Sequence, residues 1–151
     1  MKITVYSNNR LRETCARWGV ARDFADPMLN YLVYGYEPGS CFTAVLANDF
    51  YRAMGSSHPS NTVEAFKALA GWIQDTMPRE AFGNYEAVKQ WTRLEEADRR
   101  AILERQGLIY TEQEEIMKTL RDERSMEPTF SRVKLCSLTR RRICRFRNRV
   151  G

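Results

Sequence analysis

The chain has 151 residues, of which 43% are hydrophobic and 28% charged, and this composition is typical of a globular protein and excludes disorder throughout. No apolar run reaches the roughly 18 residues that cross a bilayer, and residues 1–5 lack the features of a signal peptide, so we expect a cytoplasmic protein without membrane contact. The net charge of +5 is uneven, because residues 124–151 carry nine basic residues and one acid, which leaves −3 for residues 1–123.

Four cysteines and a single histidine restrict the metal and redox chemistry that the chain can support. The cysteines are widely scattered and form no C-x-x-C pair: Cys15, Cys41, Cys136 and Cys144. Their even number permits disulfides, but no other feature suggests a secreted protein. A Cys/His zinc cluster would need ligands from opposite ends of the chain, so we expect no metal and no cofactor.

The first residues allow two structures. Residues 3–6 (Ile, Thr, Val, Tyr) suit one short N-terminal strand that ends at the polar residues after it. Asn9 can equally cap a helix over about residues 10–22, where apolar residues recur at near-helical spacing.

Stronger helix signals follow. Asp26 and Pro27 have the character of an N-cap and a first helical residue, and Gly35 suits the left-handed position that ends a helix. Ser40 is placed to cap the next helix, over about residues 41–54. The apolar face of that helix is predicted to hold Phe42, Val45, Leu46, Phe50 and Met54.

Further helices are predicted in the second half of the chain. One runs over about residues 62–77 and ends before Pro78, which cannot continue it. Asn84 is placed to cap the next, and Gly107 stops a charged helix over about residues 94–106. The predicted core comprises Phe42, Val45, Leu46, Phe50, Phe66, Ile73, Val88 and Trp91.

These patterns predict an all-α protein, a compact bundle of five to seven short helices with a basic C-terminal tail. Thr111 and Glu114 have capping-box spacing and predict the last helix. Residues 1–123 are expected to form a single helical domain. Within the tail of residues 124–151, residues 131–151 alternate arginine with apolar residues and show no helical face, so a disordered tail, a basic arm and a non-native extension all stay open.

The chain carries none of the common catalytic motifs, neither a nucleophile elbow, a zinc-protease helix, a phosphate-binding loop nor a dinucleotide fingerprint. His58 lies beside a proline in an expected loop, which is more typical of a surface residue than of a general base. The paired glutamates of the chain lie on predicted charged helices, where such pairs are usually solvated. We therefore expect no catalytic residues and no enzymatic activity.

Asn48 and Asp49 stand out because both are weak helix formers in the middle of the predicted 41–54 helix. In a structural role, Asp49 would cap a neighbouring turn or hold an arginine such as Arg52. In a functional role, Ser40, Asn48 and Asp49 would bind a partner or a small ligand.

The tail offers a second functional signal. Its arginines suit contacts with phosphates, and Phe146 suits stacking on a base. The candidate nucleic-acid-binding residues are Arg140, Arg141, Arg142, Arg145, Arg147 and Arg149. A solvated or artefactual terminus explains the same residues, and both interpretations stay open.

Residues 35–50, followed by the 62–77 helix and the segment from Tyr85 to Trp91, resemble a family of small uncharacterised bacteriophage and prophage proteins. The resemblance rests on a G-x-x-P-G turn and an A-V-L-x-N-D run within residues 35–49, and it extends over about residues 30–92. Members of the family often have Trp-Gly-Ser where this chain has Phe-Gly-Asn at residues 82–84.

The resemblance implies an accessory phage protein that binds a host factor. Small phage proteins of this kind commonly inhibit host defence or redirect host machinery. The leading hypothesis is therefore a non-enzymatic protein that binds and modulates a host macromolecule, with a host protein in the host cytoplasm as the partner. A nucleic-acid-binding protein that uses the tail and a small-ligand-binding protein are the alternatives. The oligomeric state is left open.

Overall fold

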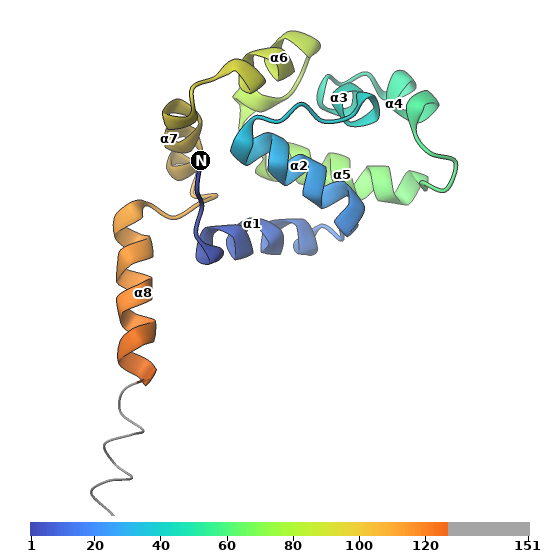
Figure 1. Cartoon of the computed structure of the whole chain (residues 1–151). Coiled ribbons are helices and arrows are strands. Elements are labelled where there is room, and N and C mark those ends of the chain that lie inside the picture. The colour runs from blue at the N-terminus through green and yellow to red at the C-terminus, as the bar shows by residue number, and fades with distance from the viewer. Residues whose placement is uncertain (127–151) are drawn as a thin grey trace, which may run out of the picture. The chain divides into compact units, whose positions relative to one another are not determined.

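Helices account for the regular structure of the described part of the chain (Figure 1). The computed structural model describes residues 1–126, and within them it holds eight α-helices, one 3-10 helix and no strand. The elements are α1 (Val5–Arg17), α2 (Arg22–Tyr34), α3 (Ser40–Leu46), α4 (Phe50–Ser56), α5 (Val63–Thr76), η1 (Arg79–Ala81), α6 (Tyr85–Arg93), α7 (Glu96–Arg105) and α8 (Glu112–Met126). The all-α prediction is confirmed, whereas the predicted number of five to seven helices is too low.

The N-terminal strand predicted over residues 3–6 is wrong, because α1 begins within it. The Thr4 hydroxyl oxygen accepts a hydrogen bond from the Ser7 amide at 3.4 Å, which makes Thr4 the N-cap. Helix α2 also begins earlier than predicted, at Arg22, so that Pro27 lies inside it and Asp26 is not its cap.

Backbone contacts divide the chain into two compact units, residues 1–111 and 112–151. Unit 1 is a compact helical bundle, in which α1 contacts α2 and α5, while α3 contacts α4 and α6. In unit 2 the structure describes only α8. The division at residue 123 stays a prediction, and nearly all of the tail that it defines lies outside the described residues.

The core of unit 1 is built mainly from aromatic and aliphatic side chains of α1, α2, α3, α5, α6 and α7. Most residues of the predicted core are buried there: Leu46, Phe66, Ile73, Val88 and Trp91. Phe42 and Val45 are half-buried against it. Phe50 is 57% exposed, so the prediction that it belongs to the core is wrong.

A buried arginine joins two helix ends inside unit 1. Arg99 of α7 donates to the Leu94 carbonyl oxygen at 2.7 Å and to the Val33 carbonyl oxygen at 3.5 Å. These carbonyls belong to the C-terminal ends of α6 and α2, where the helix dipole favours a positive charge. Gly35 ends α2 in the left-handed region, with φ 69°, as predicted, and a Cβ there would collide with the Arg99 guanidinium.

Candidate functional site

The break between α3 and α4 explains why the single helix predicted over residues 41–54 is wrong. The Asn48 amide donates to the Val45 carbonyl oxygen at 3.1 Å, and the Asp49 amide donates to the Ala44 carbonyl oxygen at 2.9 Å. This pair of bonds is a Schellman motif, which ends a helix around one left-handed residue. That residue is Asn48, with φ 61°, and among residues 1–126 it is the only non-glycine residue with a positive φ. Asparagine tolerates this region better than most side chains.

Asp49 then starts α4 and ties it to α6. Its Oδ1 accepts from the Arg52 amide at 3.2 Å, which makes it the N-cap of α4, and its Oδ2 accepts from the Tyr85 hydroxyl at 2.7 Å. The Tyr85 bond, followed by the Arg52 backbone bond, lowers the pKa of Asp49, and the same bond raises the pKa of Tyr85. Asp49 thus caps the following turn, which was its structural interpretation.

Ser40 lies at the other end of α3 from Asn48. It is the exposed first residue of α3, and Gly39 occupies the N-cap position without a side-chain hydrogen bond, so the predicted cap at Ser40 is wrong. Thr43 Oγ1 instead donates to the Pro38 carbonyl oxygen at 3.0 Å and holds the turn before α3. The structure therefore brings Asn48 and Asp49 together and leaves Ser40 apart from them.

A shallow pocket of about 150 Å³ opens beside the break. Its lining comes from α3, α4, α5 and the loop before α6: Val45, Leu46, Asn48, Phe50, Ala70, Ile73, Gln74, Phe82 and Gly83. The Gly83 amide donates to the Leu46 carbonyl oxygen at 2.8 Å, so this loop is fixed to the end of α3. The pocket is smaller than the 300–1,000 Å³ typical of small-molecule sites.

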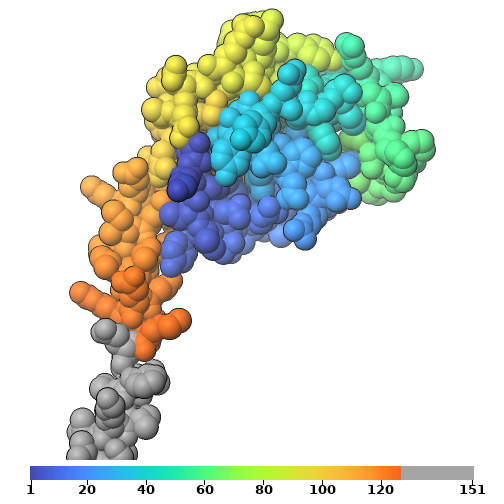
Figure 2. Space-filling view, viewed as in Figure 1, coloured from blue at the N-terminus to red at the C-terminus, as the bar shows by residue number. Residues whose placement is uncertain are grey.

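Exposed aromatic side chains surround the break. Phe50 is 57% exposed and Tyr51 is 93% exposed, and Tyr85 is also exposed. We call the surface formed by these three residues together with Asn48, Asp49 and Arg52 the corner surface. Figure 2 shows the α3–α4 segment on the outer surface of unit 1. Sequence patterns point to Asn48 and Asp49 but not to the aromatic residues, because a continuous helix over residues 41–54 places Phe50 in the core.

Other residues of the described chain that could carry chemistry have surroundings typical of structural rather than catalytic residues. His58 lies in the loop between α4 and α5, with its Nδ1 2.6 Å from Ser60 Oγ. Burial raises the pKa of the Cys15 thiol to about 11, which makes it a poor nucleophile. Over residues 1–126 there is no group of three or more His, Cys, Asp or Glu side chains that could hold a metal ion, nor a helix long and apolar enough to span a membrane.

The candidate nucleic-acid-binding residues, from Arg140 to Arg149, lie outside the described residues. Comparisons of the chain with protein-family models, with curated proteins and with solved structures gave no match. The site therefore has to be interpreted from its own geometry, which is that of a fixed turn that displays aromatic side chains.

Proposed function

We propose that this chain is a non-enzymatic phage accessory protein that binds and modulates a host protein, with the corner surface as its binding site. The observation that carries the proposal is the exposure of Phe50, Tyr51 and Tyr85 around a turn that backbone and capping hydrogen bonds hold in place. The phage origin and the host partner rest on the family resemblance. Inhibition of a host defence is the form of modulation to test first.

The composition of the corner surface favours protein recognition. Aromatic residues and arginine are enriched at protein interfaces and among the residues that dominate binding energy. Tyrosine and phenylalanine also have few rotatable bonds, so their contacts cost little conformational entropy. The Asp49–Tyr85 bond fixes one of these rings before a partner arrives, which reduces the cost of ordering it on binding.

The same geometry favours a protein partner over catalysis or a small ligand. Both Asp49 carboxylate oxygens already accept hydrogen bonds and its pKa is lowered, so it is a weak candidate for a general base. The pocket of about 150 Å³ has room for one anchoring side chain rather than for a whole small-molecule ligand.

Site-specific photo-crosslinking in the host bacterium tests the proposal. A photoreactive phenylalanine analogue replaces Tyr51 in one version of the full chain and Tyr36 in the matched control, which is also an exposed tyrosine. We expect one host protein to be crosslinked from position 51 and not from position 36. Equal crosslinking from both positions, or none from position 51, would overturn the assignment of the corner surface.

Nucleic-acid binding through the tail is the competing function, and salt dependence separates it from protein binding. If six tail arginines contact phosphates, log–log plots of affinity against salt should have a slope of about −4 to −6, with little sequence preference. Replacing those six arginines with glutamine should remove this binding. Under our proposal the same replacement leaves crosslinking from position 51 unchanged.

A further inference from the structure

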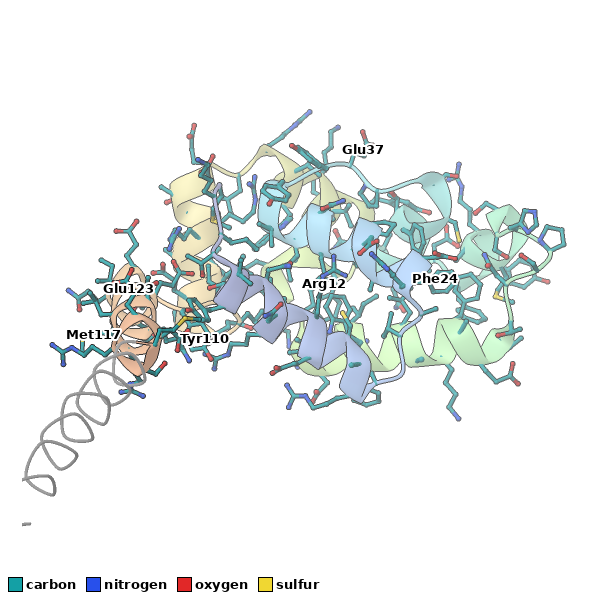
Figure 3. All side chains as sticks on the ribbon, turned by 60° about the horizontal axis from the view of Figure 1, so that its bottom comes forward. Arg12, Phe24, Glu37, Tyr110, Met117 and Glu123 are labelled. Atoms are coloured by element: carbon teal, nitrogen blue, oxygen red, sulfur yellow. The ribbon has the colours of Figure 1, made fainter. Side chains whose placement is uncertain are left out.

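Helix α8 carries apolar side chains that are exposed within the described residues. Ile116 is 59% exposed, Met117 62% and Leu120 48%, and their three- and four-residue spacing puts them on one face. Figure 3 shows the Met117 side chain pointing away from the helix. Neighbouring exposed apolar side chains of this kind are typical of interaction surfaces.

Two charged residues at the ends of this face, Glu112 and Arg124, complement each other when the helix is reversed, and Glu123 adds a further acid beside Arg124. Glu112, Ile116, Leu120 and Arg124 follow one another at four-residue spacing along one row of α8. An acidic residue thus begins the row, two apolar residues form its middle and a basic residue ends it. The positions of the row are symmetric about Lys118. When a second helix runs in the opposite direction, its basic end therefore lies beside the acidic end of the first, and the apolar residues face one another.

We propose that two copies of this chain associate through antiparallel α8 helices. Ile116 of each copy packs against Leu120 of the other, and Glu112 of each copy lies beside Arg124 of the other. Such an interface is isologous, with the same residues used by both copies, as in most homodimers. A parallel pair would instead place Glu112 beside Glu112 and Arg124 beside Arg124, and like charges oppose that arrangement.

The proposed dimer is a weak one, because each copy contributes only a few apolar side chains. The exposed ion pairs add little to its affinity and mainly select the orientation of the helices. The dimer is therefore expected to dissociate on dilution and to lose its orientation preference at high salt. This association is independent of the corner surface, so either proposal can fail without the other.

Sedimentation velocity of the full chain over a concentration series tests the association. We expect a monomer–dimer equilibrium, and Leu120→Glu should raise the dissociation constant by about tenfold or more, because it places a charge in the apolar centre. Ser125→Glu adds the same charge half a helical turn away from the face and serves as the matched control. A chain that is monomeric at every concentration, or equal effects of both substitutions, would overturn the proposal.

A charge swap tests the antiparallel orientation without disturbing the apolar residues. Glu112→Arg and Arg124→Glu should each weaken the dimer roughly two- to fivefold, because each puts like charges opposite one another. The double variant should recover the original affinity, since each copy again opposes an acid to a base. If the two effects add instead of cancelling, the helices are not antiparallel in this register.

Discussion

Aromatic side chains perform opposite tasks in two regions of unit 1, its core and its corner surface. In the core, Trp72 Nε1 donates to Thr14 Oγ1 at 2.9 Å and Trp91 Nε1 donates to the Tyr31 carbonyl oxygen at 3.2 Å, and both rings are buried. At the corner surface, Tyr51 and Tyr85 are exposed. Buried rings with satisfied polar atoms stabilise a fold, whereas exposed rings on a fixed turn are available for recognition.

Alanine substitutions at two phenylalanines, one in the core and one on the corner surface, should differ most in their effect on the free energy of unfolding. Phe66→Ala should lower the free energy of unfolding by about 3–5 kcal/mol, because it removes a fully buried ring. Phe50→Ala should lower it by about 1 kcal/mol or less, because that ring is largely exposed. Urea denaturation followed by circular dichroism measures both. Similar losses for the two variants would show that Phe50 belongs to the core after all.

The behaviour of Phe50 also shows how far sequence patterns predict this fold. The capping predictions at Gly35 and Asn84 are confirmed, and Asn84 Oδ1 accepts from the Ala87 amide at 2.8 Å, whereas the capping predictions at Asp26 and Ser40 are wrong. The prediction of a single helix over residues 41–54 is wrong because the apolar spacing of this segment continues through the break. The break is held in part by tertiary hydrogen bonds, from Tyr85 of α6 to Asp49 and from Gly83, in the loop before α6, to Leu46. Local spacing does not predict such contacts.

The candidate site was only partly predictable for the same reason. Asn48 and Asp49 drew attention because they contradict helix propensity, and such local conflicts are visible in a sequence. The Asp49–Tyr85 bond joins residues 36 positions apart in the chain, so it is a tertiary contact that local patterns do not predict.

Alanine substitutions at two glycines measure how much the Arg99 contact adds to the stability of unit 1. Gly19 and Gly35 have nearly the same φ, 67° and 69°, but only at Gly35 would a Cβ meet the Arg99 guanidinium. Gly19→Ala should cost about 1–2 kcal/mol from backbone strain alone. Gly35→Ala should cost roughly 1–3 kcal/mol more, because Arg99 must move away from the helix ends that it caps. Equal losses in thermal or urea unfolding would mean that Arg99 shifts at no cost.

A pH titration probes the hydrogen bond between Asp49 and Tyr85 in the corner surface, whose expected effect on stability is small. The pKa of Asp49 should lie below its ordinary value, so its stabilising contribution is present above the unfolded-state pKa and is lost as the pH falls through the folded-state pKa. Tyr85→Phe removes the largest cause and should raise the pKa of Asp49, as measured by NMR of the carboxyl carbon. Tyr36→Phe is the control and should leave it unchanged. An unchanged pKa in Tyr85→Phe would contradict the Asp49–Tyr85 bond.

If the corner surface serves binding rather than folding, one substitution should change the affinity for the partner without changing the stability of the chain. For Tyr51→Ala, affinity for the host protein crosslinked from position 51 and stability in urea are measured on the same full-length preparation. We predict a dissociation constant about tenfold or more above that of the unsubstituted chain, with an unchanged urea midpoint. Unchanged affinity, or a loss of affinity matched by a loss of stability, would show that the corner surface is not a binding site separate from the fold.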